Sequence, residues 1–85
     1  MRIEFTGRRE VVAAARVAFE AKVDGKDVWC SVSLDALTDR FGVSGPSAHS
    51  LVDSFEQNRV HIEHAAEKLL EKNGGQSVEL ETGDL

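Results

Sequence analysis

The stretch VAFEAKVDGKDVWCSVS, residues 17–33, predicts a β-hairpin. Asp24-Gly25 at its centre suits a type I′ turn, because both central residues of that turn need positive φ and glycine adopts it without steric cost. A two-residue turn also fixes the register of the strands, and here it places Phe19 opposite Cys30. We therefore expect an antiparallel hairpin over these residues.

This register separates the hairpin into two unlike faces. The apolar face comprises Val17, Phe19, Ala21, Val28, Cys30 and Val32. The opposite face comprises Ala18, Glu20, Lys22, Asp27, Trp29 and Ser31. A shift of one residue would mix the two sets, so the pattern favours this register alone. We expect Cys30 to point into the core and Trp29 to point away from it.

The segments on either side of the hairpin carry weaker signals. Residues 2–6 alternate in the manner of a strand, whereas residues 8–14 fit either a helical turn or the start of the next strand. Ser33 is a suitable N-cap for a short helix that Gly42 would end. Alternation over residues 77–82 predicts a final strand.

A second, longer helix is predicted over residues 46–73, with Pro46 in its first turn and Gly74-Gly75 at its end. Its apolar stripe comprises Ala48, Leu51, Val52, Phe55, Ile62, Ala66, Leu69 and Leu70. At 1.5 Å per residue this helix would be about 40 Å long, more than the core of a small domain needs. Either it bends near Asn58-Arg59, or one end projects and packs on a partner.

These elements predict a single domain over residues 1–85, of the α+β class. We expect two layers, with a three- or four-stranded, mainly antiparallel sheet and a short and a long helix on one of its faces, in the order β-β-β-α-α-β. No apolar run reaches the ~20 residues of a membrane span, and the N-terminus lacks the apolar core of a signal peptide. A single cysteine suits a reducing compartment, so the expected location is the cytoplasm.

The net charge of −5 is unevenly distributed. Residues 1–43 carry seven basic and seven acidic side chains, whereas residues 44–85 carry three basic and eight acidic ones. An acidic surface repels phosphate backbones, so binding to nucleic acid is disfavoured. The one basic cluster, Arg8, Arg9 and Arg16, is more typical of a solvated edge than of a binding arm.

The residues that suggest catalysis have simpler interpretations. A reactive cysteine needs a lowered pKa and exposure, and Cys30 is expected to be a buried, inert thiol. His61 and His64 can share a helix face, but a zinc site needs a third protein ligand, and the HExxH spacing is absent. We therefore predict no catalytic residue, no metal, no cofactor and no enzymatic activity.

Two positions remain as candidates for function. Arg59 falls inside the apolar stripe of the long helix, where its charge needs a carboxylate from Glu63, Glu56 or the C-terminal strand. A structural clamp is favoured for it over ligand binding. Trp29 lies on the helix-free face, where either the segment around Val11-Val12 or a second molecule would cover it.

The chain resembles a family of bacterial proteins of about this length, domain of unknown function 1488. The matching positions are Val17, Phe19, Gly25, Val28, Cys30, Ser33, Leu37, Phe41, Gly42, Phe55, Arg59, Ile62, Glu63, Ala66, Val78, Leu80 and Asp84. The resemblance covers nearly the whole chain, and it implies a bacterial cytosolic protein in which Arg59 and Cys30 belong to the shared pattern. Such proteins often carry an aromatic where this chain has Val11-Val12, so no role is transferred to that segment. The family supplies no activity, ligand or catalytic residue.

The sequence thus leads to two main functional hypotheses, and a third, less favoured one is a thiol or metal enzyme that would use Cys30 or zinc. The first is a small, non-enzymatic protein that acts through contacts with an unknown protein partner or with itself, as a homodimer, with Trp29 and Arg59 as candidate positions. The alternative is a nucleic-acid-associated regulator that uses Arg8, Arg9 and Arg16.

Overall fold

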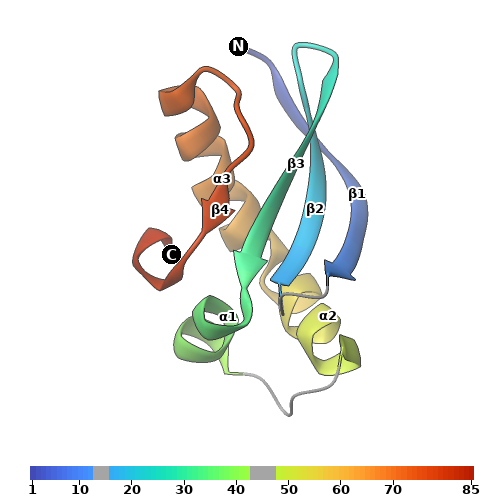
Figure 1. Cartoon of the computed structure of the whole chain (residues 1–85), viewed down its shortest axis with the longest axis vertical. Helices are drawn as coiled ribbons and strands as arrows, with labels where there is room; N and C mark the ends of the chain where they lie inside the picture. The colour runs from blue at the N-terminus through green and yellow to red at the C-terminus, as the bar shows by residue number, and fades with distance from the viewer. Residues whose placement is uncertain (13–15, 43–47) are drawn as a thin grey trace.

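The computed structural model describes residues 1–12, 16–42 and 48–85, and it confirms the α+β class (Figure 1). The elements are β1 (Ile3–Val12), β2 (Arg16–Val23), β3 (Lys26–Ser33), α1 (Leu34–Phe41), α2 (Ala48–Gln57), α3 (Arg59–Asn73), β4 (Glu79–Leu80) and the 3-10 turn η1 (Thr82–Asp84). The sheet has four strands in the order β1-β2-β3-β4. Strands β1, β2 and β3 are antiparallel, whereas β4 runs parallel to β3, so the sheet is mixed.

The central hairpin has the predicted register. Phe19 pairs with Cys30 and Glu20 pairs with Trp29. Asp24 has φ of 52° and Gly25 has φ of 86°, as a type I′ turn requires. The alternation of residues 17–33 was therefore sufficient to determine which side chains share a face.

Strand β1 is longer than the sequence indicated and contains a β-bulge. Residues 8–12, which the sequence left open between a helical turn and a strand, continue β1 as far as Val12. Phe5 pairs with Ala21 and Arg9 pairs with Phe19, so four steps along β1 match two steps along β2. Gly7 lies inside this irregularity with φ of 90°, a conformation that glycine adopts without strain.

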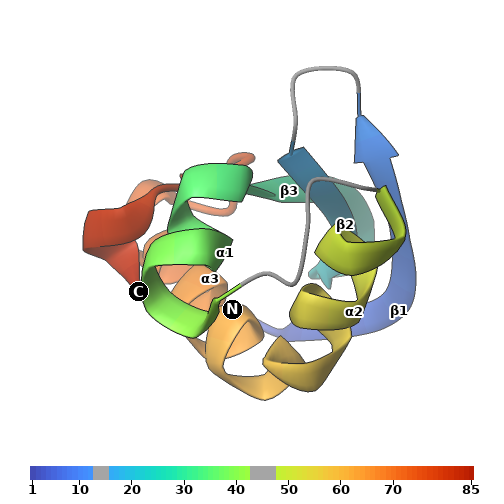
Figure 2. The same cartoon turned by 90° about the horizontal axis from the view of Figure 1, so that it is seen from below.

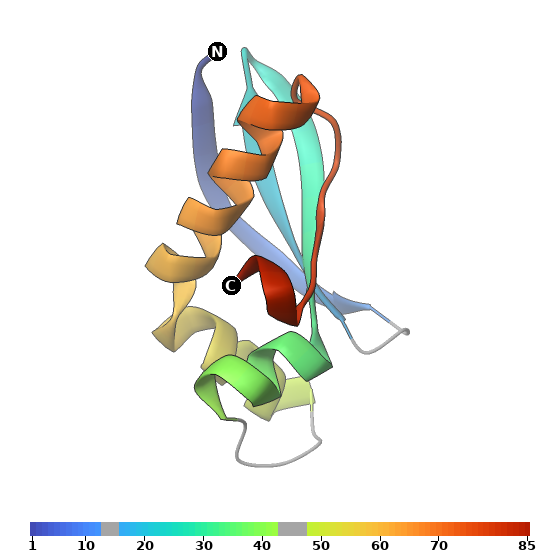
Figure 3. The same ribbon diagram turned by 90° about the vertical axis from the view of Figure 1, so that its left-hand side faces the viewer.

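The core lies between one face of the sheet and the helices. Phe19 stacks between Phe5 and Phe55, with ring centroids 6.1 Å and 5.2 Å away. Figures 2 and 3 show α1, α2 and α3 gathered on one side of the sheet. The buried apolar side chains form one cluster, made of Val17, Phe19, Ala21, Val23, Cys30, Val32, Ala36, Leu37, Leu51, Phe55, Ile62, Ala66, Leu70, Val78 and Leu80.

The long predicted helix is broken into α2 and α3 at Asn58, so the bend is the alternative that the structure supports. The Asn58 side chain donates a hydrogen bond to the Ser54 carbonyl at 2.9 Å. Local bonds of this kind compete with the helical pattern, and asparagine is therefore a common place for a helix to break. The predicted start of the helix at Pro46 lies outside the described residues.

The other helix ends agree with the sequence. Ser33 caps α1, because its hydroxyl accepts a hydrogen bond from the Ala36 N–H at 3.0 Å. Gly42 follows α1 with φ of 76°, and Gly74 ends α3 in the left-handed conformation. None of the described helices has the length and hydropathy that a membrane span requires.

Candidate functional site: the helix-free face of the sheet

The side of the sheet that points away from the helices is called the outer face here. Strand register and alternation assign to it Glu4, Thr6, Arg8, Glu10, Arg16, Ala18, Glu20, Lys22, Asp27, Trp29, Ser31 and Glu79. Charged and polar side chains dominate this set. Apart from the small Ala18, the one apolar side chain in the set is Trp29, and 37 % of its surface is exposed. Among the described residues, no helix covers it.

Arg8 lies beside Trp29 and reaches it from the bulge in β1. The Arg8 guanidinium carbon is 5.8 Å from the centre of the Trp29 ring, within the range of a cation–π contact. Arg8 itself remains 70 % exposed. The outer face therefore carries a tryptophan with an accessible cation next to it.

Glu20 is buried on this face, which was not predicted from the sequence. Only 4 % of its surface is exposed, although no helix packs above it. The Thr6 hydroxyl donates to one carboxylate oxygen at 2.9 Å, and Arg8 Nη1 lies 3.4 Å from the other. The bulge explains the burial, because its two extra residues place both Thr6 and Arg8 opposite Glu20. Gly7 inside an alternating strand was the available signal, since such glycines often mark bulges.

Arg16 joins three strands on the outer face. Its guanidinium donates to the Ser31 hydroxyl at 2.9 Å and to the Leu80 carbonyl at 3.2 Å. It also forms an ion pair with Glu81 at 2.8 Å, and this hydrogen bond, with help from Ser33, lowers the pKa of Glu81. Arg16 thus ties the short strand β4 to β2.

The three arginines of the N-terminal cluster do not form one patch. Arg8 and Arg16 point to the outer face, whereas Arg9 points to the helix side and forms an ion pair with Glu56 on α2. Each of the three contacts a carboxylate. Their charge is therefore spread over two faces and partly neutralised.

Arg59 lies on the helix side, at the start of α3. It forms ion pairs with Glu63 at 2.7 Å and Glu56 at 3.6 Å, two of the three carboxylate partners that the sequence offered. The hydrogen bond with Glu63 is the main cause that raises the pKa of Arg59. Its guanidinium also lies against Gly7, where an added Cβ would be 3.1 Å from Nη2.

The structure does not bring Trp29 and Arg59 together, but the bulge in β1 lies between them. Gly7 faces inward and contacts Arg59, while its neighbour Arg8 faces outward and contacts Trp29. The bulge that makes room for Arg59 therefore also positions the cation beside Trp29.

The structure places Cys30 in the core and His61 against an aromatic ring. Cys30 is 1 % exposed, and this burial raises the pKa of its thiol. A hydrogen bond with the Val78 backbone acts in the opposite direction and lowers the pKa. His61 packs edge-on against the ring of Phe41. In the part of the chain that the structure describes, no three His, Cys, Asp or Glu side chains are grouped to hold a metal ion.

Fold and surface together define a small two-layer α+β protein with a mixed sheet, helices on one face and an open, charged opposite face that presents a tryptophan. The family model for the protein of unknown function DUF1488 matches residues 3–81, and the chain belongs to this family. The crystal structure of a DUF1488 family protein of unknown function from Shewanella loihica PV-4 is similar, with a TM-score of 0.84 and 23 % sequence identity. That match covers 94 % of each chain and shows the shared fold. No curated protein matches the chain.

Proposed function

We propose that this protein acts through protein contacts and without catalysis, and that its outer face binds a second copy of the chain. The observation that carries the proposal is the exposure of Trp29 on a sheet face that no described helix covers. Tryptophan is enriched among the residues that dominate binding energy at interfaces, because it provides a large, rigid contact area. The charged side chains around it resemble the polar rim of such an interface.

The arrangement of the four strands allows a second copy as the partner. Arg8 lies on β1 at one edge of the outer face, and Glu79 lies on β4 at the other edge. A two-fold axis parallel to the strands would place β1 of each copy over β4 of the other. The strand register places Glu10 level with Glu79, so Arg8 would reach Glu79 of the second copy diagonally, from two residues along β1. This contact would occur at two equivalent positions, as an isologous interface requires. A domain of this size buries little surface alone and would gain stability from the pairing.

Two further observations support this proposal over its competitors. The ion pairs of Arg8, Arg9 and Arg16 leave little concentrated positive charge for nucleic acid. Burial of Cys30 removes the strongest nucleophile of the described residues from contact with substrates.

Sedimentation equilibrium over a wide concentration range tests the proposal. We expect a reversible dimer for the natural chain and a monomer for Trp29→Lys. Lysine is chosen because Glu20 lies directly opposite and can pair with it, so the sheet should remain folded. Circular dichroism of the variant checks this.

A matched pair of charge reversals locates the interface. Glu79→Lys should shift the dimer Kd about tenfold, which corresponds to roughly 1.4 kcal/mol, because it reverses the charge that faces Glu10 and Arg8 of the second copy. The same substitution at Glu71, on α3 in the helix layer, should leave the dimer unchanged. A natural chain that stays monomeric at every concentration would refute the proposal, as would equal effects of the two reversals. Retardation of DNA or RNA at low salt that Arg8→Gln abolishes would favour the nucleic-acid alternative instead.

A further inference from the structure

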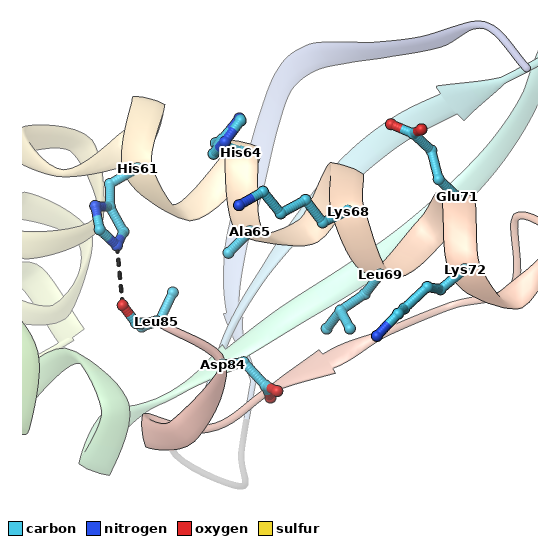
Figure 4. A pocket seen from close by; sticks show the side chains of 9 residues that line it. All are labelled: His61, His64, Ala65, Lys68, Leu69, Glu71, Lys72, Asp84 and Leu85. Atoms are coloured by element: carbon cyan, nitrogen blue, oxygen red, sulfur yellow. Dashed lines mark hydrogen bonds between the residues drawn. The ribbon is translucent and has the colours of Figure 1, made fainter.

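A groove of about 670 Å³ lies between α3 and the C-terminal turn η1, on the helix side of the molecule (Figure 4). Its floor is apolar and includes Ala65, Leu69 and Leu85, which are partly buried against the core. His61 closes one end, and its Nε2 lies 3.2 Å from the Leu85 carbonyl oxygen. The groove is thus built by two segments that are distant in sequence and linked by this contact.

Two cations border the groove. Lys68 and Lys72 are one helical turn apart on α3, and Figure 4 shows both side chains extending along the helix, Lys68 on the side of His64 and Lys72 on the side of Leu69. Neither forms an ion pair with any carboxylate of the described residues. Most of the other basic side chains in the structure do have such a partner, so the two free ammonium groups distinguish this groove.

Two acidic side chains, Glu71 and Asp84, also line the groove. Figure 4 shows Glu71 pointing away from the cavity. Asp84 lies on the opposite wall, where its carboxylate accepts a hydrogen bond from the Glu81 N–H at 2.9 Å. An anion in the groove would therefore be held on the α3 side, near the lysines.

We propose that this groove binds an amphiphilic organic anion. Its head, a carboxylate or a phosphate, would lie between Lys68 and Lys72, and its apolar part would lie against Leu69 and Leu85. The volume falls within the range of small-molecule sites, which combine apolar walls with a few polar groups. Lysine ammonium groups bind both kinds of head as compact charges. The proposal is independent of dimerisation, because the groove and the outer face lie on opposite sides of the sheet.

Titration of the isotope-labelled full chain, followed by backbone amide NMR shifts, tests the site. The probes are decanoate and decyl phosphate below their micelle concentrations, with decanol as the uncharged control. Both anions should cause saturable shifts over residues 61–72 and 84–85, and decanol should cause weaker ones. Tighter binding of one anion identifies the head that the site prefers. Equal binding of decanol, or no saturable shift with either anion, would overturn the proposal.

A matched pair of double variants tests the role of the lysines. Lys68→Gln with Lys72→Gln should raise the Kd for the bound anion about tenfold. Lys22→Gln with Lys26→Gln removes the same charge from the hairpin and should leave the Kd unchanged. Equal losses in both would mean that only net charge matters and would contradict a defined site. All four lysines are exposed, so the variants should fold, and their amide spectra report this directly.

Discussion

The two faces of the central hairpin are covered in different ways, although they belong to the same strands. On the inner face, Phe19 is 2 % exposed because α2 packs over it through Phe55. On the outer face, Glu20 is buried by Thr6 and Arg8, side chains of the neighbouring strand. The inner face therefore depends on the tertiary packing of helices, whereas the outer face covers itself with local ion pairs and hydrogen bonds.

This difference leaves one large apolar side chain exposed on the outer face. The outer face shields its central carboxylate but leaves Trp29 accessible, with Arg8 beside it. Within the chain Trp29 contacts Arg8, but more than a third of its surface stays accessible. Because Trp29 stays accessible on the outer face, we assign the binding of a second copy to that face.

The largest expected effect separates the two faces directly. Phe19→Ala should lower the free energy of unfolding by about 3–5 kcal/mol, because it leaves a cavity between Phe5 and Phe55. Trp29→Lys, measured where the chain is monomeric, should lower it by less than about 1 kcal/mol, as surface changes do. Urea denaturation measures both. Similar losses would show that Trp29 belongs to the core of one chain.

A smaller effect is expected where the helix layer meets the β1 bulge. Arg59→Met should cost about 2 kcal/mol, because it removes both ion pairs and leaves Glu63 partly buried without a partner. Lys68→Met on the same helix has no ion pair to lose and should change stability by less than about 0.5 kcal/mol. Thermal denaturation of the two variants gives the comparison. If both behave alike, Arg59 is not a clamp.

The inner face also predicts a dependence of stability on pH. Burial raises the pKa of Cys30 above its ordinary value of 9.0, so the unfolded chain loses this proton at lower pH than the folded chain does. The free energy of unfolding should therefore fall as pH rises above 9.0, by at most about 1.4 kcal/mol per pH unit. Denaturation between neutral and alkaline pH should show a shallower slope for Cys30→Ala. Identical slopes would contradict the burial of a neutral thiol.

The smallest effect is expected for an exposed ion pair of the outer face. Lys22 and Asp27 lie opposite each other, with 3.7 Å between the charged atoms. Lys22→Gln should change the free energy of unfolding by less than about 0.5 kcal/mol, because exposed pairs contribute little. Raising the salt concentration should remove even that difference. A loss above 1 kcal/mol would show that the outer face also depends on this pair.

The sequence was informative wherever a signal was local. Asp24-Gly25 and the alternation around it predicted the register, and Ser33 and Gly42 predicted the ends of α1. The carboxylate partners of Arg59 followed from helical spacing. These features depend on neighbours within a turn or across a two-residue loop, and residue types alone specify them.

Features that depend on distant segments were not predictable in the same way. Burial of Glu20 requires the bulge in β1, and the alternation of residues 2–6 does not reveal how many extra residues the bulge contains. The basic cluster looked continuous in sequence, yet strand alternation sends Arg9 to the other side from Arg8. The groove beside Lys68 forms only when η1 returns to α3, which no periodicity of either segment indicates.

The central claim is that Trp29 meets a second copy of the chain. An isotope-filtered NOE experiment on a mixture of labelled and unlabelled chains detects contacts between copies and no others. We predict intermolecular NOEs between the Trp29 ring and outer-face protons of β2, with Glu20 and Ala18 the nearest candidates. A dimer whose intermolecular NOEs involve only helix residues, or a sample with none at concentrations where two chains associate, would contradict it.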